Sequence, residues 1–425
     1  MLAASFSSTF ERWMLRKILN ATGPAPIRLT FGDSPGVSPP GTTPVATIAI
    51  RDTAALFRLM LDAEIGLGDG YADGGIEVQG DLVSTAEALY RTWPSIGGGG
   101  AGSKLWSRCM EHFRANTPRR SRDNVHHHYD LRTDFYQHWL DPELVYTCAY
   151  FPTPSATLEE AQFAKMDHVC RKLQLQPGET VVEAGCGWGA LALHMARQFG
   201  VRVKAFNLSH EQIVYARQRA RQEGLSEQVE FIEDDYRNIS GRFDAFVSVG
   251  MLEHVGLSQY AEFGRVIHRS IGSSGRGLLH FIGRNYPAPL SAWIRKRIFP
   301  GAYAPTLREA MEILEPFDFS VCDVENLRLH YAKTLEHWLA RFERSSQQLT
   351  EMFDERFVRT WRVYLAGSLV AFRVGTLQLF QMTFAGSQCQ RIPWTRAHLY
   401  EAEHPQPQEQ TQEQTQEQTW TSAMS

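Results

Sequence analysis

Residues 185–189 read Gly-Cys-Gly-Trp-Gly, and Glu183 stands two residues before them. Alternating glycines permit a tight turn and let a ligand approach the bare backbone. The spacing is not the dinucleotide fingerprint G-x-G-x-x-G, and it is not a P-loop because no Gly-Lys-Ser/Thr follows. A carboxylate at 183 would repel a pyrophosphate but would suit a cationic or amine-bearing ligand. The alternative is a plain glycine-rich turn.

The segments around this loop have the pattern of an α/β nucleotide-binding unit. Residues 180–184 are β-branched and apolar without a helical period, which is typical of a buried strand. From Gly189 onward Leu191, Met195 and Phe199 recur at four-residue spacing, which predicts a helix ended by Gly200. Strand, glycine turn and helix, with the carboxylate, resemble motif I of S-adenosylmethionine-dependent methyltransferases, whose ligand carries an ammonium and a sulfonium.

Further strands and helices alternate along the chain. An amphipathic helix is predicted over 158–173 and a capped helix over 209–223, and strands are predicted at 180–184, 201–206, 229–232, 243–249 and 277–282. This alternation predicts an α/β fold with a doubly wound, Rossmann-like parallel sheet that binds its ligands at the carboxyl ends of the strands. Asn207, residues 234–236 and residues 250–254 follow predicted strands and should meet there.

The chain, at 425 residues, is long enough for two domains. We expect a smaller N-terminal α+β domain over 1–96, a linker over 97–122 that contains GGGGAG, a catalytic domain over 123–400 and a disordered tail over 401–425. The N-terminal part predicts helices at 6–18, 54–63 and 82–92 and a strand at 47–51, with a loop-like stretch at 65–82. From residue 326 to 384 the pattern is read as helical.

Composition excludes several classes of protein. A net charge of −4 without a basic motif argues against a nucleic-acid binder. The six cysteines contain no C-x-x-C pair, so reduced thiols and a cytoplasmic location are expected. The histidines at 126–128 cannot all face one metal ion from regular structure, so no metal site is expected.

Seven motifs in order resemble the cyclopropane-fatty-acyl-phospholipid synthases. They are HHYDLRTDFYQHWLDPELVYTCAYF, VEAGCGWGALALHMA, NLSHEQIVYA, DDYRNI, FDAFVSVGMLEHVG, LLHFIG and RLHYAKTLEHW. The stretch LGDGYADGGIEVQGDL also looks like the N-terminal, lipid-binding domain of the bacterial members that act on phospholipids. The resemblance covers residues 50–390, and it implies a methyltransferase.

The resemblance also implies two sets of site residues. S-adenosylmethionine would be held by Tyr146, Thr147, Glu183, Ala184, Gly185, Cys186, Gly187, Trp188, Gly189, Asn207, Leu208, Gln212, Asp235 and Tyr236. Bicarbonate would be held at the catalytic centre by Cys148, Glu253, His280, Tyr331 and the backbone of Ile282. Thr133, Thr147, Glu183 and Leu252 depart from the usual family residues, but none of these changes removes a proposed ligand.

The implied reaction adds a methylene group to the cis double bond of a phospholipid acyl chain. Methyl transfer to an alkene leaves a carbocation, which Tyr146, Tyr150 and Phe281 could stabilise through their ring faces. A weak base such as bicarbonate would then remove a proton from the new methyl group and the ring would close. The alternatives are methyl- or methylene-branched products, methylation of a small amine, or a lipid-binding protein with an inactive core.

A phospholipid substrate implies contact with an anionic membrane surface. No apolar run reaches the ~18 residues of a membrane-spanning helix, so we expect peripheral association with the inner face of the membrane. The candidates for docking are the basic amphipathic helix at 6–18, whose alternative role is to pack on its own domain, the basic residues of 104–122, and the segment WIRKRIF at 293–299. The family resemblance also implies a homodimer.

Overall fold

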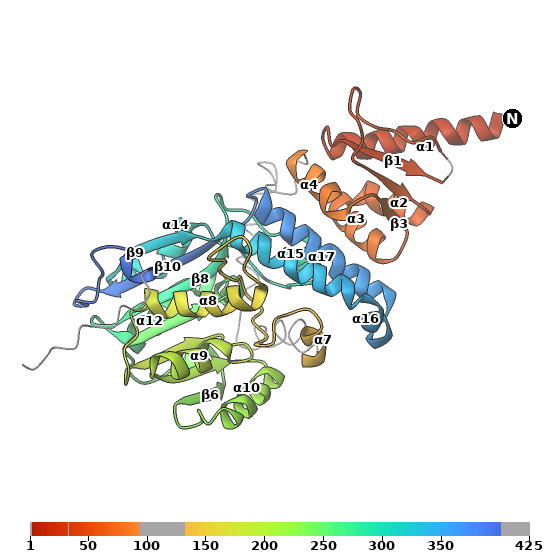
Figure 1. Ribbon diagram of the computed structural model, residues 1–425. Coiled ribbons are helices and arrows are strands. Elements are labelled where there is room, and N and C mark those ends of the chain that lie inside the picture. The colour runs from red at the N-terminus through yellow and green to blue at the C-terminus, as the bar shows by residue number, and fades with distance from the viewer. Residues whose placement is uncertain (1, 33, 93–131, 401–425) are drawn as a thin grey trace, which may run out of the picture. The chain divides into compact units, whose positions relative to one another are not determined.

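The computed structural model describes residues 2–32, 34–92 and 132–400 (Figure 1). The predicted linker with its glycine run, the basic residues of 104–122, the three histidines and the predicted disordered tail from 401 lie outside the described residues. Residues up to Ile392 belong to one compact unit. The described residues from Pro393 belong to a second unit, which contains the 3-10 helix η4 (Ala397–Leu399).

The N-terminal part has its own sheet and its own core. Its elements are α1 (Leu2–Ala21), β1 (Ile27–Phe31), β2 (Ala46–Ile50), α2 (Thr53–Leu61), α3 (Ala63–Ala72), β3 (Ile76–Gln79) and α4 (Leu82–Thr92). β2 lies between β1, which is parallel to it, and β3, which is antiparallel. Leu15, Ile27, Ile48 and Leu56 are among the buried side chains that pack together here. This arrangement agrees with the α+β class expected for residues 1–96.

The stretch at 65–82 is not the loop that the sequence predicted. Most of it forms α3 and β3, although α3 contains three glycines. Two of those glycines permit close packing, because a Cβ at Gly68 would lie 2.4 Å from the Trp293 ring and one at Gly70 would lie 2.5 Å from Ile76. Asp62 caps the helix by accepting from the backbone N–H groups of Glu64 and Ile65. Tertiary contacts therefore outweigh the low helix propensity of glycine.

The second part is built on a seven-stranded sheet. Its strands are β4 (Thr180–Ala184), β5 (Arg202–Asn207), β6 (Val229–Glu233), β7 (Ala245–Val249), β8 (Arg276–Gly283), β9 (Phe319–Asn326) and β10 (Gln378–Gly386), in the order β6-β5-β4-β7-β8-β10-β9. The first five strands are parallel to one another, and β10 is antiparallel to both of its neighbours. The five strands predicted from the sequence are all present, with ends that differ by two residues at most.

Helices lie on both faces of this sheet (Figure 1). The helices of this part of the chain are α7 (Thr133–Gln137), α8 (Leu158–Lys172), α9 (Ala190–Phe199), α10 (His210–Gln222), α11 (Leu252–Val255), α12 (Tyr260–Ile271), α13 (Ala292–Arg297), α14 (Leu307–Met311), α15 (Arg328–Arg344), α16 (Ser346–Met352) and α17 (Glu355–Arg373). Val181 of β4 packs in one core with α8, α9 and α10, whereas the next residue, Val182, packs in another with α12. Neighbouring residues thus face opposite layers, as in a doubly wound sheet.

The end of the chain's helical region differs from the sequence prediction. Residues 328–373 are helical as expected, but 378–386 form β10, and 319–326 form β9. Eight of the nine residues of β10 are buried, so this strand has no polar face. A short apolar run of this kind does not distinguish a buried strand from a buried helix by its period.

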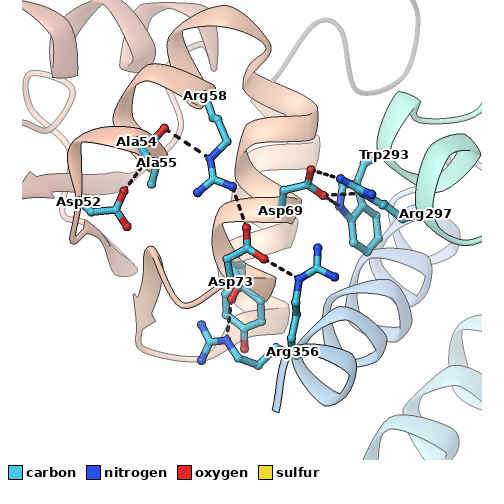
Figure 2. A network of polar contacts seen from close by, with 11 residues as sticks. Asp52, Ala54, Ala55, Arg58, Asp69, Asp73, Trp293, Arg297 and Arg356 are labelled. Carbon is cyan, nitrogen blue, oxygen red and sulfur yellow. Dashed lines mark hydrogen bonds and ion pairs between the residues drawn. The ribbon is translucent and has the colours of Figure 1, made fainter. Parts of the chain in front are cut away.

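Polar contacts join the two parts within the same compact unit. Asp69 of α3 accepts hydrogen bonds from the Trp293 indole at 3.1 Å and from Arg297 at 2.9 and 2.6 Å (Figure 2). Asp73 accepts from Arg356 of α17 at 2.6 Å (Figure 2). The long helix α17 packs against both α3 and α4.

Candidate active site

A first cavity of about 150 Å³ lies at the carboxyl ends of β4, β5 and β7. Of the predicted cofactor residues, it is lined by Tyr146, Thr147, Glu183, Gly185, Cys186, Gly187, Trp188, Asn207, Leu208, Gln212 and Tyr236. Ala184, Gly189 and Asp235 do not line it. Asp234, which precedes Asp235, and Lys165 of α8 also line the cavity, and the sequence did not indicate either as a ligand.

Two of the three glycines of the loop, Gly187 and Gly189, have different structural roles. All three have positive φ values, of 86° at Gly185, 53° at Gly187 and 87° at Gly189. A Cβ at Gly187 would meet nothing within 4 Å, so its backbone faces open space in the cavity wall. A Cβ at Gly189 would lie 2.6 Å from the ring of Phe231, so this glycine permits close packing of α9 on the sheet.

Glu183, the penultimate residue of β4, is a buried carboxylate in the cavity wall. It is 2% exposed, and its Oε2 has no hydrogen-bond partner among the described residues. Burial raises the pKa of Glu183 to about 8, although the nearby Lys165 ammonium opposes this shift. Burial lowers the pKa of Lys165 to about 8, and its Nζ donates to Thr147 Oγ1 at 3.1 Å. The cavity therefore contains an acceptor that a cationic ligand would satisfy.

Asn207 and Gln212 meet at the end of β5. The Asn207 side-chain amide donates to Gln212 Oε1 at 2.7 Å and to the carbonyl of Gly187 at 3.2 Å. Ser209 caps α10, as predicted, but the Gln212 side chain bonds Asn207 rather than completing a capping box. This arrangement leaves the Gln212 amide nitrogen as a donor at the cavity wall.

Asp235 does not line the cavity, although its Oδ2 is buried without a partner among the described residues. Its Oδ1 accepts from the backbone N–H and the Nε of Arg237, at 3.0 and 2.8 Å, which caps the 3-10 helix η1 (Tyr236–Asn238). Asp234 lines the cavity instead. The sequence alone does not show which of two adjacent aspartates in a turn directs its side chain toward the cavity.

A second cavity, of about 220 Å³, lies beside the first and is mostly apolar. All five predicted catalytic residues line it: Cys148, Glu253, His280, Ile282 and Tyr331. Leu67 of α3 and Leu82, Ala86 and Leu89 of α4 also line it. The N-terminal part therefore supplies one wall of the cavity that contains the predicted catalytic residues.

Three buried polar atoms of this cavity lack partners among the described residues: one each on Glu253 and His280, and Nε of Arg284. Glu253 accepts from the backbone N–H of Ile282 at 2.5 Å through Oε1, whereas its Oε2 is unpaired, and burial raises its pKa to about 7. Gln381 donates through Nε2 to Nδ1 of His280 at 3.1 Å, which leaves the proton of the neutral ring on Nε2. His280 Nε2 is the second unpaired atom, and burial keeps the pKa of His280 well below its usual range.

Gln381 is a site residue that the sequence analysis missed. It lies on β10 opposite His280 of β8 and is fully buried. The stretch was read as helical, so nothing placed this glutamine beside a histidine a hundred residues away. A buried amide in an otherwise apolar run was the available signal.

The two cavities share Tyr146, Thr147, Gly250 and His254 as wall residues. Gly250 has a φ of 74°, and a Cβ on it would lie 2.9 Å from Thr147 Cγ2. The Tyr146 hydroxyl lies 2.8 Å from that of Tyr364 on α17. The two cavities are therefore adjacent, and these four residues lie where they adjoin.

Two of the three aromatic residues expected beside a carbocation lie elsewhere. Phe281 is fully buried on the opposite face of β8 from His280, in the core with α12. Tyr150 lines neither cavity and stacks between His168 and His330, with ring centroids 4.3 and 4.9 Å away. Only Tyr146, of these three, lies at the cavity wall.

The candidate docking segments also differ in their placement. Trp293 and Arg297 contact Asp69, so this part of WIRKRIF packs against α3 instead of facing outward. In α1, Met14 and Ile18 are buried in the N-terminal core, whereas Phe10 and Trp13 are 55% and 53% exposed and stack on each other. The helix packs on its own part of the chain and still presents two aromatic side chains. No helix among the described residues is long and apolar enough to cross a bilayer.

Comparison with known proteins agrees with this geometry. Residues 116–382 match the family model described as mycolic acid cyclopropane synthetase. The chain belongs to this family. A probable fatty acid methyltransferase of Pseudomonas putida is 34% identical over 85% of this chain and 93% of its own length. The cyclopropane-fatty-acyl-phospholipid synthase of Escherichia coli K12 is 33% identical over 82% and 90%.

Solved structures give the same assignment for the seven-stranded part. The cyclopropane synthase MmaA2 from Mycobacterium tuberculosis has a TM-score of 0.60 and 31% identity, covering 62% of this chain and 98% of its own. The mycolic acid cyclopropane synthase CmaA1 complexed with SAH and CTAB has a TM-score of 0.59 and 32% identity, covering 62% and 97%. This family member is thus a methyltransferase with the class I S-adenosylmethionine-dependent fold.

Proposed function

We propose that this enzyme transfers a methylene group from S-adenosylmethionine to the cis double bond of phospholipid acyl chains and forms cyclopropane fatty acids. The observation that carries the proposal is the wall shared by the two cavities. One cavity has the glycine loop and a buried carboxylate, and the other is apolar with unpaired polar atoms at Glu253 and His280. A methyl donor and an alkene would meet at Tyr146, Thr147 and Gly250.

The first cavity has the groups that S-adenosylmethionine requires. The unpaired Glu183 Oε2 suits the cationic end of the ligand, and the bare backbone of Gly187 permits close approach. The Gln212 amide can bond a ribose hydroxyl, and either Asp234, which lines the cavity, or Asp235, whose Oδ2 is unpaired, can accept from an adenine amino group. When bound, S-adenosylmethionine supplies an electrophilic methyl group.

The second cavity has a donor set that suits bicarbonate. His280 presents its Nε2–H, and Cys148 and Tyr331 line the same space. With a pKa raised to about 7, Glu253 is partly protonated near neutral pH and can also donate a hydrogen bond to an anion. The Ile282 N–H already donates to Glu253, so a hydrogen bond from it to bicarbonate would be shared with the Glu253 carboxylate. When bound, bicarbonate supplies a weak base for the proton of the new methyl group.

The lipid would enter through the N-terminal part. Helices α3 and α4 give the acyl cavity an apolar wall, which supports the assignment of residues 1–96 as a lipid-binding domain. Phe10 and Trp13 are suitable for insertion into the interface of an anionic membrane, and Lys17, whose Nζ lies 5.3 Å from the Trp13 ring, adds positive charge. A peripheral, homodimeric enzyme remains part of this proposal.

A second product has a specific observation in its favour. The relative from Pseudomonas putida, named a probable fatty acid methyltransferase, is as similar to this chain as the cyclopropane synthase from Escherichia coli. A branched chain would form if the proton were lost from a chain carbon instead of from the new methyl group. The intact set Cys148, Glu253, His280 and Tyr331 favours the ring.

Mass spectrometry of lipids tests the proposal. The full chain is incubated with S-adenosylmethionine and vesicles of a dioleoyl phospholipid, and fatty-acid methyl esters are analysed. A product one CH₂ heavier that carries a cyclopropane ring supports the proposal, whereas an olefinic branch of the same mass supports the second product. No modified lipid with any vesicle composition, although S-adenosylmethionine binds, would reject both. Equal rates in carbonate-free buffer would reject bicarbonate as the base.

A further inference from the structure

Arg284 lies in the wall of the apolar cavity and is 4% exposed. It follows β8 directly, and its backbone continues the extended chain through a bridge to Thr306. A guanidinium carries five N–H donors and stays charged at neutral pH. Its removal from water is costly unless an anion or acceptor compensates for it.

No hydrogen-bonded partner of this kind is found for Arg284 in the described part of the chain. No carbonyl, hydroxyl or carboxylate of residues 2–32, 34–92 or 132–400 accepts a hydrogen bond from the Arg284 side chain, and its Nε is fully buried without a partner. Other buried cations differ in this respect. Arg276, for example, donates to Glu179 at 2.6 Å and to the carbonyl of Gln174 at 3.0 Å.

The nearest acid does not neutralise Arg284 by direct contact. Glu64 of α3 lines the same cavity, but its carboxylate accepts from the backbone N–H of Ala292 at 3.1 Å and makes no ion pair with Arg284. Burial raises the pKa of Glu64, and its carboxyl acts on Arg284 only through a longer-range electrostatic interaction. Tyr90 of α4, the other polar neighbour from the N-terminal part, is a neutral phenol whose pKa burial raises to about 12.

Arg284 stands at a defined distance from the reaction centre. His280, Ile282 and Arg284 are alternate residues of one extended segment, and all three line the cavity. At about 3.3 Å per residue, four residues separate His280 from Arg284 by about 13 Å. In a bilayer with a ~30 Å hydrocarbon core and ~40–45 Å total thickness, a mid-chain double bond lies roughly 10–15 Å from the phosphate layer.

We propose that Arg284 is the subsite for the phosphodiester of the lipid substrate, bound between the two parts of the chain while the acyl double bond reaches Glu253 and His280. This inference rests on the proposed function and deepens it. A fatty-acid carboxylate could pair with an arginine in a similar way. Its distance from the double bond is shorter than that of the phosphate, because the glycerol lies between the acyl carboxyl and the phosphate. The separation from His280 therefore favours the phosphodiester.

The test compares two lipids that differ in the phosphodiester. Dioleoyl phosphatidylcholine and dioleoylglycerol are supplied to the full chain in the same nonionic micelles, so that membrane charge plays no part. Arg284→Gln should raise KM for the phospholipid about tenfold or more and leave KM for the diacylglycerol unchanged, since a charged hydrogen-bonded contact is lost. Arg284→Lys should recover part of this loss, and Lys296→Gln, which removes an exposed charge on α13, should match the wild type.

Stability distinguishes a ligand site from a structural arginine. Because the charge is unpaired, Arg284→Gln should keep or raise the Tm of the lipid-free protein and keep its affinity for S-adenosylmethionine. An unchanged KM for phospholipid, an equal rise for both lipids, or a lowered Tm overturns the inference. A KM rise with oleate as large as with phospholipid would assign the subsite to a carboxylate and also overturn it.

Failure of the proposed function would look different. In that case the wild type modifies no lipid, and the subsite is tested by binding. Dihexanoyl phosphatidylcholine should raise the Tm of the wild type, and glycerol 3-phosphate alone should raise it less. Neither ligand should raise the Tm of Arg284→Gln. A rise in the Tm of this variant equal to that of the wild type overturns the inference.

Discussion

Nε2 of Gln381 donates a hydrogen bond of 3.1 Å to Nδ1 of His280, from a strand antiparallel to that of the histidine. This contact selects the ring tautomer that presents Nε2–H to the cavity. The amide thus acts on the reaction through the histidine, and it is a positioning residue.

Replacement of Gln381 by Leu should lower kcat by about 10- to 100-fold, because the tautomer is no longer fixed. Affinity for S-adenosylmethionine, measured by calorimetry, should not change. Gln378→Leu is the matched control, since this buried glutamine of the same strand bonds Asn326 and the carbonyl of Gly375 away from the cavity. Equal losses of kcat in the two variants would contradict a specific role for Gln381.

Affinity for S-adenosylmethionine should rise with pH because of Glu183. Its pKa is raised to about 8 in the folded protein, and a cationic ligand prefers the ionised form. Below that pKa the affinity should increase by up to roughly tenfold per pH unit. Calorimetry at pH 6.5, 7.5 and 8.5 measures this slope. Glu183→Gln should abolish it, whereas Glu230→Gln, on the exposed side of the edge strand β6, should retain it.

Glu183 and Glu253 should also make the ligand-free protein less stable as pH rises from 6.5 to 8. Both carboxyls have folded-state pKa values raised by burial, to about 8 and about 7, so the folded state binds more protons than the unfolded state in this window. The free energy of unfolding should fall by up to about 1.4 kcal/mol per pH unit for each group. Urea unfolding at several pH values measures the slope, and Glu183→Gln should flatten it most toward pH 6.5, where the folded-state carboxyl is still protonated and the unfolded one is not.

Two glycines of the loop should respond differently to alanine. Gly187→Ala should fold, at a cost of about 1 kcal/mol for its positive φ, but should lose affinity for S-adenosylmethionine because its methyl group would enter the cavity. Gly189→Ala should instead lower Tm strongly, because its Cβ would lie 2.6 Å from Phe231. Thermal unfolding and calorimetry on both variants separate the effects, and a reversed pattern would contradict the assignment.

Removal of Phe10 and Trp13 should weaken binding to vesicles. Each side chain contributes about 1.5–3 kcal/mol when fully buried, so partial insertion of both predicts a loss of about 10- to 100-fold in the partition coefficient of the double alanine variant. Sedimentation with anionic vesicles measures it. Phe163→Ala is the control, since this phenylalanine of α8 is equally exposed, at 50%. If both variants bind alike, α1 is not the docking element.

The sequence was sufficient for the parallel half of the sheet because each strand there is followed by a glycine turn or a polar cluster. It was insufficient where burial is complete. β10 has no polar face, so its period is lost, and with it the contact between Gln381 and His280. Spacing placed Glu183 and Gln212 at one cavity. It did not tell Asp234 from Asp235, or show that Phe281 faces the opposite layer from His280, because these depend on the direction of single side chains.

Helix α17 contacts α3 through Arg356 and Arg359, and its Tyr364 contacts Tyr146 between the two cavities. The N-terminal part is therefore not an interchangeable module. A chimera that takes residues 1–92 from a relative would place foreign α3 and α4 surfaces against a native α17, and the mismatch would reach the tyrosine pair. To transfer the substrate range of a relative to this chain, residues 1–92 and residues 355–373 should have to be replaced together.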